Sequence, residues 1–127
     1  MPLSGFATAE GTQRYRNRFA GRVAEGHFRL RGGLWLSSLG VGTYLGEHDA
    51  ATDELYTRAV AHALELGVNV IDTAINYRFQ RSERSIAAAL AGLVKQGKLT
   101  RDEVIVSTKA GFLTPDGDYP PNPTAYF

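Results

Sequence analysis

The segment that decides the fold is residues 67–77, Gly-Val-Asn-Val-Ile-Asp-Thr-Ala-Ile-Asn-Tyr. Its apolar residues alternate, so that Val68, Val70 and Asp72 would share one face of a β-strand. The glycine at its start stands where a preceding helix would end, because glycine readily adopts the backbone conformation that stops a helix. The segment therefore predicts a helix end, a short buried strand that closes on Asp72, and a loop that leads to Tyr77.

A helix is expected directly before this strand. Asp49 or Thr52 can cap its first turn, because a short polar side chain accepts hydrogen bonds from the free amides there. Four apolar residues follow at helical spacing and predict its buried stripe, namely Leu55, Ala59, Ala63 and Leu66. The strand before that helix, residues 39–43, contains two glycines, which usually mark a close approach by other backbone or by a ligand.

A second helix and a third strand follow the decisive segment. The helix is expected to open near Ser82 and Glu83 and to stop at Gly97. Its buried stripe is predicted to contain Ile86, Leu90, Leu93 and Val94. The strand covers residues 104–108 and is followed by Lys109.

Two short apolar runs flank Gly32-Gly33 upstream of these elements and predict a β-hairpin. After the hairpin, the order strand, helix, strand, helix, strand with short links is typical of the α/β class. Such a sequence predicts a parallel sheet covered by helices.

The composition limits the class of protein. With 127 residues, of which 43% are apolar, the chain is long enough for one domain or part of one. It has no cysteine, which excludes disulfides and thiolate catalysis. The start lacks the features of a secretion signal, and the longest apolar stretch, residues 86–94, is too short to span a bilayer. We therefore expect a soluble, cytoplasmic protein without a membrane partner.

The charge is unevenly distributed. The net charge is +1, but residues 1–31 hold six arginines and two glutamates. Residues 1–26 show no sustained hydrophobic periodicity, and we expect them to form a loosely ordered, arginine-rich leader. Such a leader would become ordered only by docking onto another surface. Its arginines either are solvated or contact an acidic surface of the protein itself. A nucleic-acid arm would also be basic, but Glu10 and Glu25 interrupt this one, so no nucleic-acid partner is expected.

Asp72, Tyr77 and Lys109 form the strongest candidate site. If the strands that lead to Asp72 and Lys109 are parallel neighbours, both side chains emerge at the carboxyl edge of the sheet, where α/β proteins carry their chemistry. A lysine ammonium close to a tyrosine favours the phenolate and eases proton release, and an aspartate can hold that lysine in place. Each residue alone has an ordinary interpretation, as a turn cap, a packed loop aromatic or a solvated strand end. Their spacing makes the combination specific.

Residues 40–46, Gly-Val-Gly-Thr-Tyr-Leu-Gly, do not match the dinucleotide-binding fingerprint, because Leu45 occupies the position of its third glycine. A Rossmann fold is therefore disfavoured. The glycines instead let a flat ring or a ribose approach the backbone, with Thr43 offering a hydroxyl and Tyr44 a stacking face; a tight turn needed for packing is the alternative. His48 lies at the same edge and is a weaker catalytic candidate. No pair of histidines has metal-ligand spacing, so no metal is expected.

Several separated motifs closely resemble those of the aldo-keto reductases, over about residues 28–112. The motifs are Leu39-Gly40-Val41-Gly42-Thr43, Gly67-Val68-Asn69-Val70-Ile71-Asp72-Thr73-Ala74, Tyr77, Arg81-Ser82-Glu83 and Ser107-Thr108-Lys109. The resemblance implies a (β/α)8 TIM barrel whose floor is closed by the hairpin. It also implies an oxidoreductase that reduces a small aldehyde or ketone with NADPH, so that NADP(H) is the expected cofactor.

The resemblance assigns a role to each candidate residue. Tyr77 would be the proton donor, with Lys109 and Asp72 lowering its pKa. The nicotinamide half of the cofactor would lie near Gly42, Thr43 and Tyr44, and its ribose near Asp72.

Some features depart from the pattern of the family. Ala87 replaces the glycine after Glu-x-x-Ile, and residues 78–80 are bulkier than those that often follow the tyrosine. Residues 27–127 hold only about three βα units, so we expect an N-terminal, truncated part of the barrel, with the catalytic histidine of the family beyond Phe127. Such a fragment would be inactive and aggregation-prone alone. The alternatives are a non-catalytic, nucleotide-binding regulatory subunit of the same fold and a short interaction module.

Overall fold

The computed structural model describes residues 3–122 and 124. In chain order, the elements are α1 (Ala9–Arg18), β1 (Phe28–Arg31), β2 (Leu34–Ser37), β3 (Gly40–Gly42), α2 (Ala50–Glu65), β4 (Val70–Asp72), α3 (Arg81–Lys95), the short 3-10 helix η1 (Arg101–Glu103) and β5 (Ile105–Ser107). No helix within the described part of the chain is long and apolar enough to cross a membrane.

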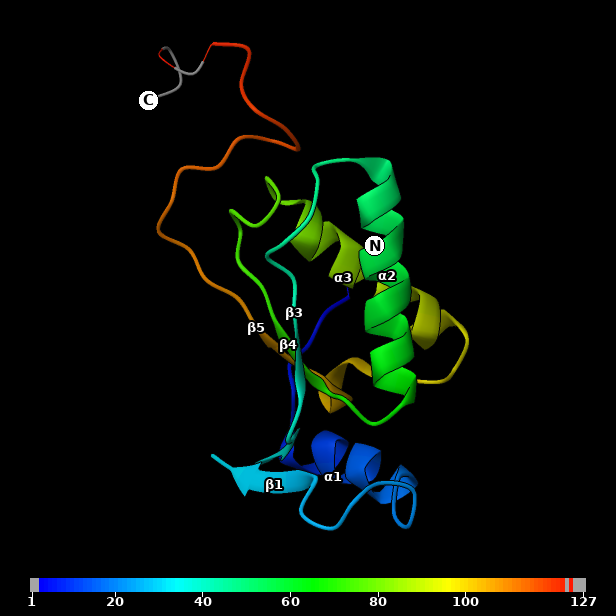
Figure 1. Ribbon diagram of the computed structural model, residues 1–127. Coiled ribbons are helices and arrows are strands. Elements are labelled where there is room, and N and C mark those ends of the chain that lie inside the picture. Colours follow the sequence, from blue (N-terminus) through cyan, green and yellow to red (C-terminus); the bar gives the residue numbers. More distant parts are fainter. Residues whose placement is uncertain (1–2, 123, 125–127) are drawn as a thin grey trace.

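The central sheet is parallel, as the sequence predicted. Its strands lie in the order β3-β4-β5. Gly42 pairs with Asp72, and Asp72 pairs with Ser107, so the three strands end level with one another. Helices α2 and α3 lie on the same side of this sheet (Figure 1). The α/β class is therefore confirmed, and the short parallel sheet is compatible with part of a barrel.

The hairpin is also confirmed. Strands β1 and β2 are antiparallel, and Gly32 and Gly33 have φ angles of 56° and 80° between them. Two successive positive φ angles define the tight turn whose twist matches that of the strands. The hairpin is attached to the sheet by the fully buried Asn69, whose side chain accepts from Ser37 N at 3.0 Å and donates to Trp35 O at 3.0 Å.

The buried face of α2 differs from the predicted stripe. Val60 and Leu64 are 0% and 2% exposed, whereas the predicted Leu55 and Leu66 are 63% and 56% exposed. Alanine and leucine occur on more than one face of this helix, so periodicity alone did not select the face that packs. In α3 the prediction holds for Ile86, Leu90 and Leu93, which are buried, while Val94 is half-buried.

The start of the chain is more ordered than predicted. Where we expected a loosely ordered leader, residues 9–18 form α1, with the Thr8 hydroxyl accepting from Gly11 N at 2.9 Å as its N-cap. The helix docks because Arg14 and Arg18 both bond to the buried carboxylate of Glu103. An acidic surface of the protein itself was one of the two environments expected for these arginines, and Glu103 provides it.

Aromatic packing completes the docking of α1. Tyr15 is fully buried, donates to Leu64 O at 2.5 Å and packs on the rings of Phe19 and Phe28. Helix α1 and the hairpin therefore lie together at the amino end of the sheet (Figure 1). The division of the chain into a leader and a barrel portion at residues 26 and 27 stays a prediction, and residues 123 and 125–127 of that portion lie outside the described residues.

Candidate active site

The structure brings Asp72, Tyr77 and Lys109 together at the carboxyl edge of the sheet. Asp72 ends β4, and Lys109 follows β5, which pairs with β4 in parallel. The Lys109 ammonium donates to both carboxylate oxygens of Asp72 at 3.0 Å and to Thr73 O at 2.7 Å. Its distance to the Tyr77 hydroxyl is 3.4 Å. The convergence expected from strand pairing is therefore present, whereas the catalytic roles stay predictions.

The environment favours a charged lysine. The hydrogen bond to Asp72 is the main cause that raises the pKa of Lys109 above its ordinary value, and the hydrogen bond to Tyr77 and the charge of Asp72 add to it. Desolvation by burial is the second-largest influence on this pKa and opposes the shift. Because the side chains of Lys109 and Asp72 are each 49% exposed, the three groups remain within reach of a bound molecule.

The first turn of α3 holds the strand ends on both sides of β4. Ser82 donates from its hydroxyl to Thr43 O at 2.6 Å, beyond the end of β3. Glu83 accepts from the Thr108 hydroxyl at 2.5 Å, beyond the end of β5. Lys109 follows Thr108 directly, so this contact fixes the backbone that carries the ammonium.

The glycines of β3 serve two purposes. A Cβ at Gly40 would lie 3.2 Å from Val70 O, so this glycine permits close packing of the neighbouring backbone. A Cβ at Gly42 would meet nothing within 4 Å, so open space lies beside this residue. The second position is the one predicted to face the cofactor, and it leaves room for one.

Thr43 and Tyr44 lie differently from each other. Thr43 is fully buried, and its hydroxyl donates to Asp72 O at 3.0 Å, so this group is already engaged with the protein. Tyr44 is 65% exposed, and its ring lies 5.0 Å from that of Tyr77 in an edge-to-face arrangement. Tyr44 thus retains a free face for stacking, whereas Thr43 acts on the site through the backbone. Cofactor binding by Gly42, Thr43, Tyr44 and Asp72 stays a prediction.

Sequence reasoning missed the importance of Arg78. Arg78, Phe79 and Gln80 have φ angles of 50°, 53° and 72°, which non-glycine residues rarely adopt. Arg78 is only 4% exposed, and it donates to Glu47 O at 2.8 Å and to Asp53 Oδ1 at 2.6 Å. The bulk of residues 78–80 was the available signal, but in the sequence it was evident only as a departure from the pattern of the family.

His48 is positioned by aromatic packing. Its ring lies 4.7 Å from that of Phe79 and 5.5 Å from that of Tyr119. No interaction in the described part of the chain connects His48 with Tyr77 or Lys109. Residues 3–122 and 124 contain no group of three or more acidic, histidine or cysteine residues that could hold a metal ion.

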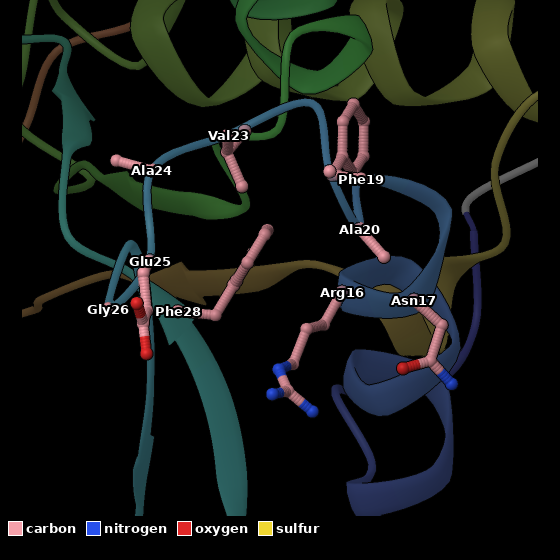
Figure 2. Close-up of a pocket in the computed structure, with 10 residues that line it drawn as sticks. Arg16, Asn17, Phe19, Ala20, Val23, Ala24, Glu25, Gly26 and Phe28 are labelled. Carbon is pink, nitrogen blue, oxygen red and sulfur yellow. The ribbon is translucent and has the colours of Figure 1, made fainter.

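A separate hollow lies between α1 and the connection to β1. It has a volume of about 290 Å³ and is lined by Phe19, Val23 and Phe28, with the Arg16 side chain at its border (Figure 2). The Arg16 guanidinium already lies 4.0 Å from the centre of the Trp35 ring. This hollow is at the amino end of the sheet, opposite to Asp72 and its partners, so it is not part of the candidate active site.

Comparison with known families gives one finding. The model of the aldo/keto reductase family matches residues 38–125. This range contains all three strands of the central sheet and all three converging side chains. It leaves out α1 and both strands of the hairpin.

Proposed function

The chain belongs to the aldo/keto reductase family, and from this premise we propose that it carries the proton-donating part of an NADPH-dependent reductase of small aldehydes or ketones. Oxidoreduction with a nicotinamide cofactor and a carbonyl substrate is the general activity of the family. The observation that supports the specific roles is the position of the Lys109 ammonium, 3.0 Å from Asp72 and 3.4 Å from the Tyr77 hydroxyl.

Each of the three residues has one role in the protonation of the substrate. A reduced nicotinamide cofactor, when bound, would supply the hydride for the carbonyl carbon. Tyr77 gives its hydroxyl proton to the carbonyl oxygen as negative charge develops there. Lys109 stabilises the resulting phenolate, and Asp72 keeps the ammonium in place. General-acid assistance of this kind contributes about 10² to 10⁴-fold to a rate.

The open space at Gly42 and the exposed ring of Tyr44 fit a flat nicotinamide ring beside these groups. The buried Thr43 would support that ring indirectly, because its hydroxyl fixes the backbone of Asp72. We propose NADPH rather than NADH on the resemblance alone.

We also propose that the reductase needs further βα units. The described residues contain three parallel strands, and three strands do not close a barrel. The edges of β3 and β5 have no outer partner strand within the described part of the chain. Residues 1–127 would then be inactive alone and would associate through these edges.

The test is the oxidation of NADPH, followed by absorbance, in a reductase that contains this chain with the remaining strands. A panel of small aldehydes and ketones is compared for the wild type, Tyr77→Phe and the control Tyr119→Phe. We expect Tyr77→Phe to lower kcat by about 10² to 10⁴-fold and Tyr119→Phe to leave it nearly unchanged. Equal, negligible rates for the wild type and Tyr77→Phe would contradict the reductase and would fit a nucleotide-binding regulatory subunit.

A further inference from the structure

A cavity of about 350 Å³ lies beside the reactive tyrosine. It is formed by the loop between β3 and α2 and by the loop that follows β4, and its lining includes Tyr44, His48, Asn76, Arg78 and Phe79. We propose that this cavity binds a carboxylate at the far end of the carbonyl substrate. The proposal rests on the proposed function and names a substrate class for it: oxo acids in which an aldehyde or ketone lies several bonds from a carboxylate.

Arg78 supplies the first argument. Its side chain is almost completely buried, and two of its three nitrogens are bonded, Nε to Glu47 O at 2.8 Å and Nη2 to Asp53 Oδ1 at 2.6 Å. Nη1 is buried and has no hydrogen-bond partner among the described residues. A buried guanidinium donor without an acceptor is costly, so a ligand oxygen that accepts from Nη1 binds with a free-energy gain.

The ion pairs around Arg78 leave its Nη1 donor available for an acceptor. Asp53 also bonds to Arg81 Nη1 through its second oxygen at 2.6 Å, so two guanidinium groups share one carboxylate. The nearby Asp49 carboxylate is exposed and accepts from Thr52 N at the start of α2. Asp116 pairs with Arg84 on the surface. Two guanidinium groups therefore share one partly buried carboxylate, and the exposed Asp49 carboxylate, whose charge interacts with both of them, supplies the second negative charge.

His48 supplies a second polar atom. Its Nδ1 is buried and also has no hydrogen-bond partner in the described part of the chain. Packing against Phe79 and Tyr119 fixes the plane of the ring. When Nδ1 carries its proton, His48 offers a second donor beside Arg78 in the lining of the cavity.

The backbone of the loop is consistent with a functional constraint. The three successive residues Arg78, Phe79 and Gln80 all have a left-handed backbone conformation. This conformation is unfavourable for non-glycine residues and occurs preferentially at binding and catalytic sites. This conformation turns the loop so that the Arg78 side chain lies in the protein instead of in solvent.

The cavity is placed to act on a substrate held at Tyr77. Tyr44 lines the cavity, and its ring lies 5.0 Å from that of Tyr77. A substrate whose carbonyl oxygen meets the Tyr77 hydroxyl can therefore pass along Tyr44 and place its other end in the cavity. The side chains of Tyr44 and Leu45 are 65% and 74% exposed, so either one can change its rotamer to admit a ligand to the cavity without disturbing the core.

The test measures binding, not turnover, and uses the reductase that contains this chain with the remaining strands. Saturation-transfer NMR and calorimetry compare 4-carboxybenzaldehyde with methyl 4-formylbenzoate, in which the charge is removed and the aldehyde is retained. We expect the acid to bind at least about tenfold more tightly than the ester, since a hydrogen bond to a charged group has at least that effect. Arg78→Gln and His48→Phe should each reduce this preference, and the surface control Arg84→Gln should retain it.

His48→Phe keeps the ring packing and removes only the polar atoms, so it decides the question if Arg78→Gln does not fold. Equal binding of acid and ester, or a preference that survives in His48→Phe, would overturn the proposal. Binding of inorganic phosphate as tight as that of the acid would also overturn it, because the site would then take any free anion. Tyr77→Phe should bind the acid like the wild type. Tight binding of the acid together with equal, negligible NADPH oxidation by the wild type and Tyr77→Phe would refute the proposed function and leave the carboxylate site intact.

Discussion

Replacing Glu103 by glutamine should release α1 from the rest of the protein. Glu103 is 1% exposed and accepts from Arg14 Nε at 3.2 Å, from Arg18 Nη2 at 3.1 Å and from Thr100 N at 2.9 Å. Glutamine can still accept from Thr100 but removes the charge to which both arginines bond. Arg18 Nη1 also donates to Glu103, so the arginines make three charge-assisted hydrogen bonds, and a bond of this kind contributes about 1.5 to 3 kcal/mol.

Exposure of the arginines reduces this sum. The side chains of Arg14 and Arg18 are 49% and 39% exposed, so water replaces part of what they lose. We therefore expect the free energy of local opening of α1 to fall by about 2 kcal/mol, which lowers amide protection roughly 30-fold. Hydrogen exchange of the amides of Tyr15 to Arg18 measures this change directly.

The matched control is Glu65→Gln, because Glu65 pairs with Lys98 on the surface at 3.1 Å and both side chains are about half exposed. An exposed pair of this kind contributes about 0 to 1 kcal/mol, and it does not contact α1. Protection of α1 in Glu103→Gln within about twofold of the wild type would refute the reasoning, since a twofold change is only about 0.4 kcal/mol.

Two further predictions concern pH and the core. Burial alone would raise the pKa of Glu103, but hydrogen bonds from Arg18 and Thr100 and the charges of Arg18 and Arg14 outweigh it, and the net pKa is lowered. The stabilisation of α1 by Glu103 is therefore complete above the ordinary carboxylate pKa of about 4.3, and it is lost as the pH falls through the lower pKa of Glu103 in the folded protein. Amide protection of α1 that stays constant down to about pH 3 would contradict this. Leu64→Ala should destabilise the protein by about 2 to 5 kcal/mol, whereas Leu66→Ala, at a residue 56% exposed, should cost less than about 0.5 kcal/mol. Urea titration followed by Trp35 fluorescence compares the two, and equal losses would refute the assigned face of α2.

The order and type of the elements in the sheet region were predictable, because local chemistry determines them. Gly32-Gly33 adopts the positive φ angles that a two-residue hairpin turn requires. Asp49 caps α2, and Gly67 and Gly97 have the positive φ angles that follow a helix end. Each of these signals depends on residues that are neighbours in the chain.

Helix α1 and the buried face of α2 depended on contacts that a local pattern does not contain. Arg14 and Arg18 find their common partner Glu103 more than eighty residues later. Residues 1–26 contain many charges and few apolar residues, and this composition is typical of an unfolded tail. The partner that orders the segment is not evident from its own sequence. Leu64 is buried because its side chain belongs to the core cluster with Tyr15 and Ile71, whereas Leu66 follows the end of α2 and is exposed.

One part of the candidate site could also be predicted from the sequence, and another part could not. Asp72 and Lys109 could be placed together because parallel strands end at one edge, and the register of β4 and β5 has this arrangement. The cavity around Arg78 could not be anticipated, because Arg78 meets Asp53 only through the packing of the loop after β4 against α2. The left-handed backbone of residues 78–80 is likewise imposed by that packing and not by local preference.

The convergence of carboxylate, phenol and ammonium is tested most directly by a titration of the Lys109 side-chain nitrogen, followed by NMR in the wild type, Asp72→Asn and Tyr77→Phe. The hydrogen bond from Lys109 to Asp72 is the main cause of its raised pKa, and Tyr77 adds to it. The account predicts a midpoint above the ordinary value of 10.5 in the wild type, a clear fall in Asp72→Asn and a smaller fall in Tyr77→Phe. An identical midpoint in all three proteins would show that the groups do not meet and would contradict the assignment of the site.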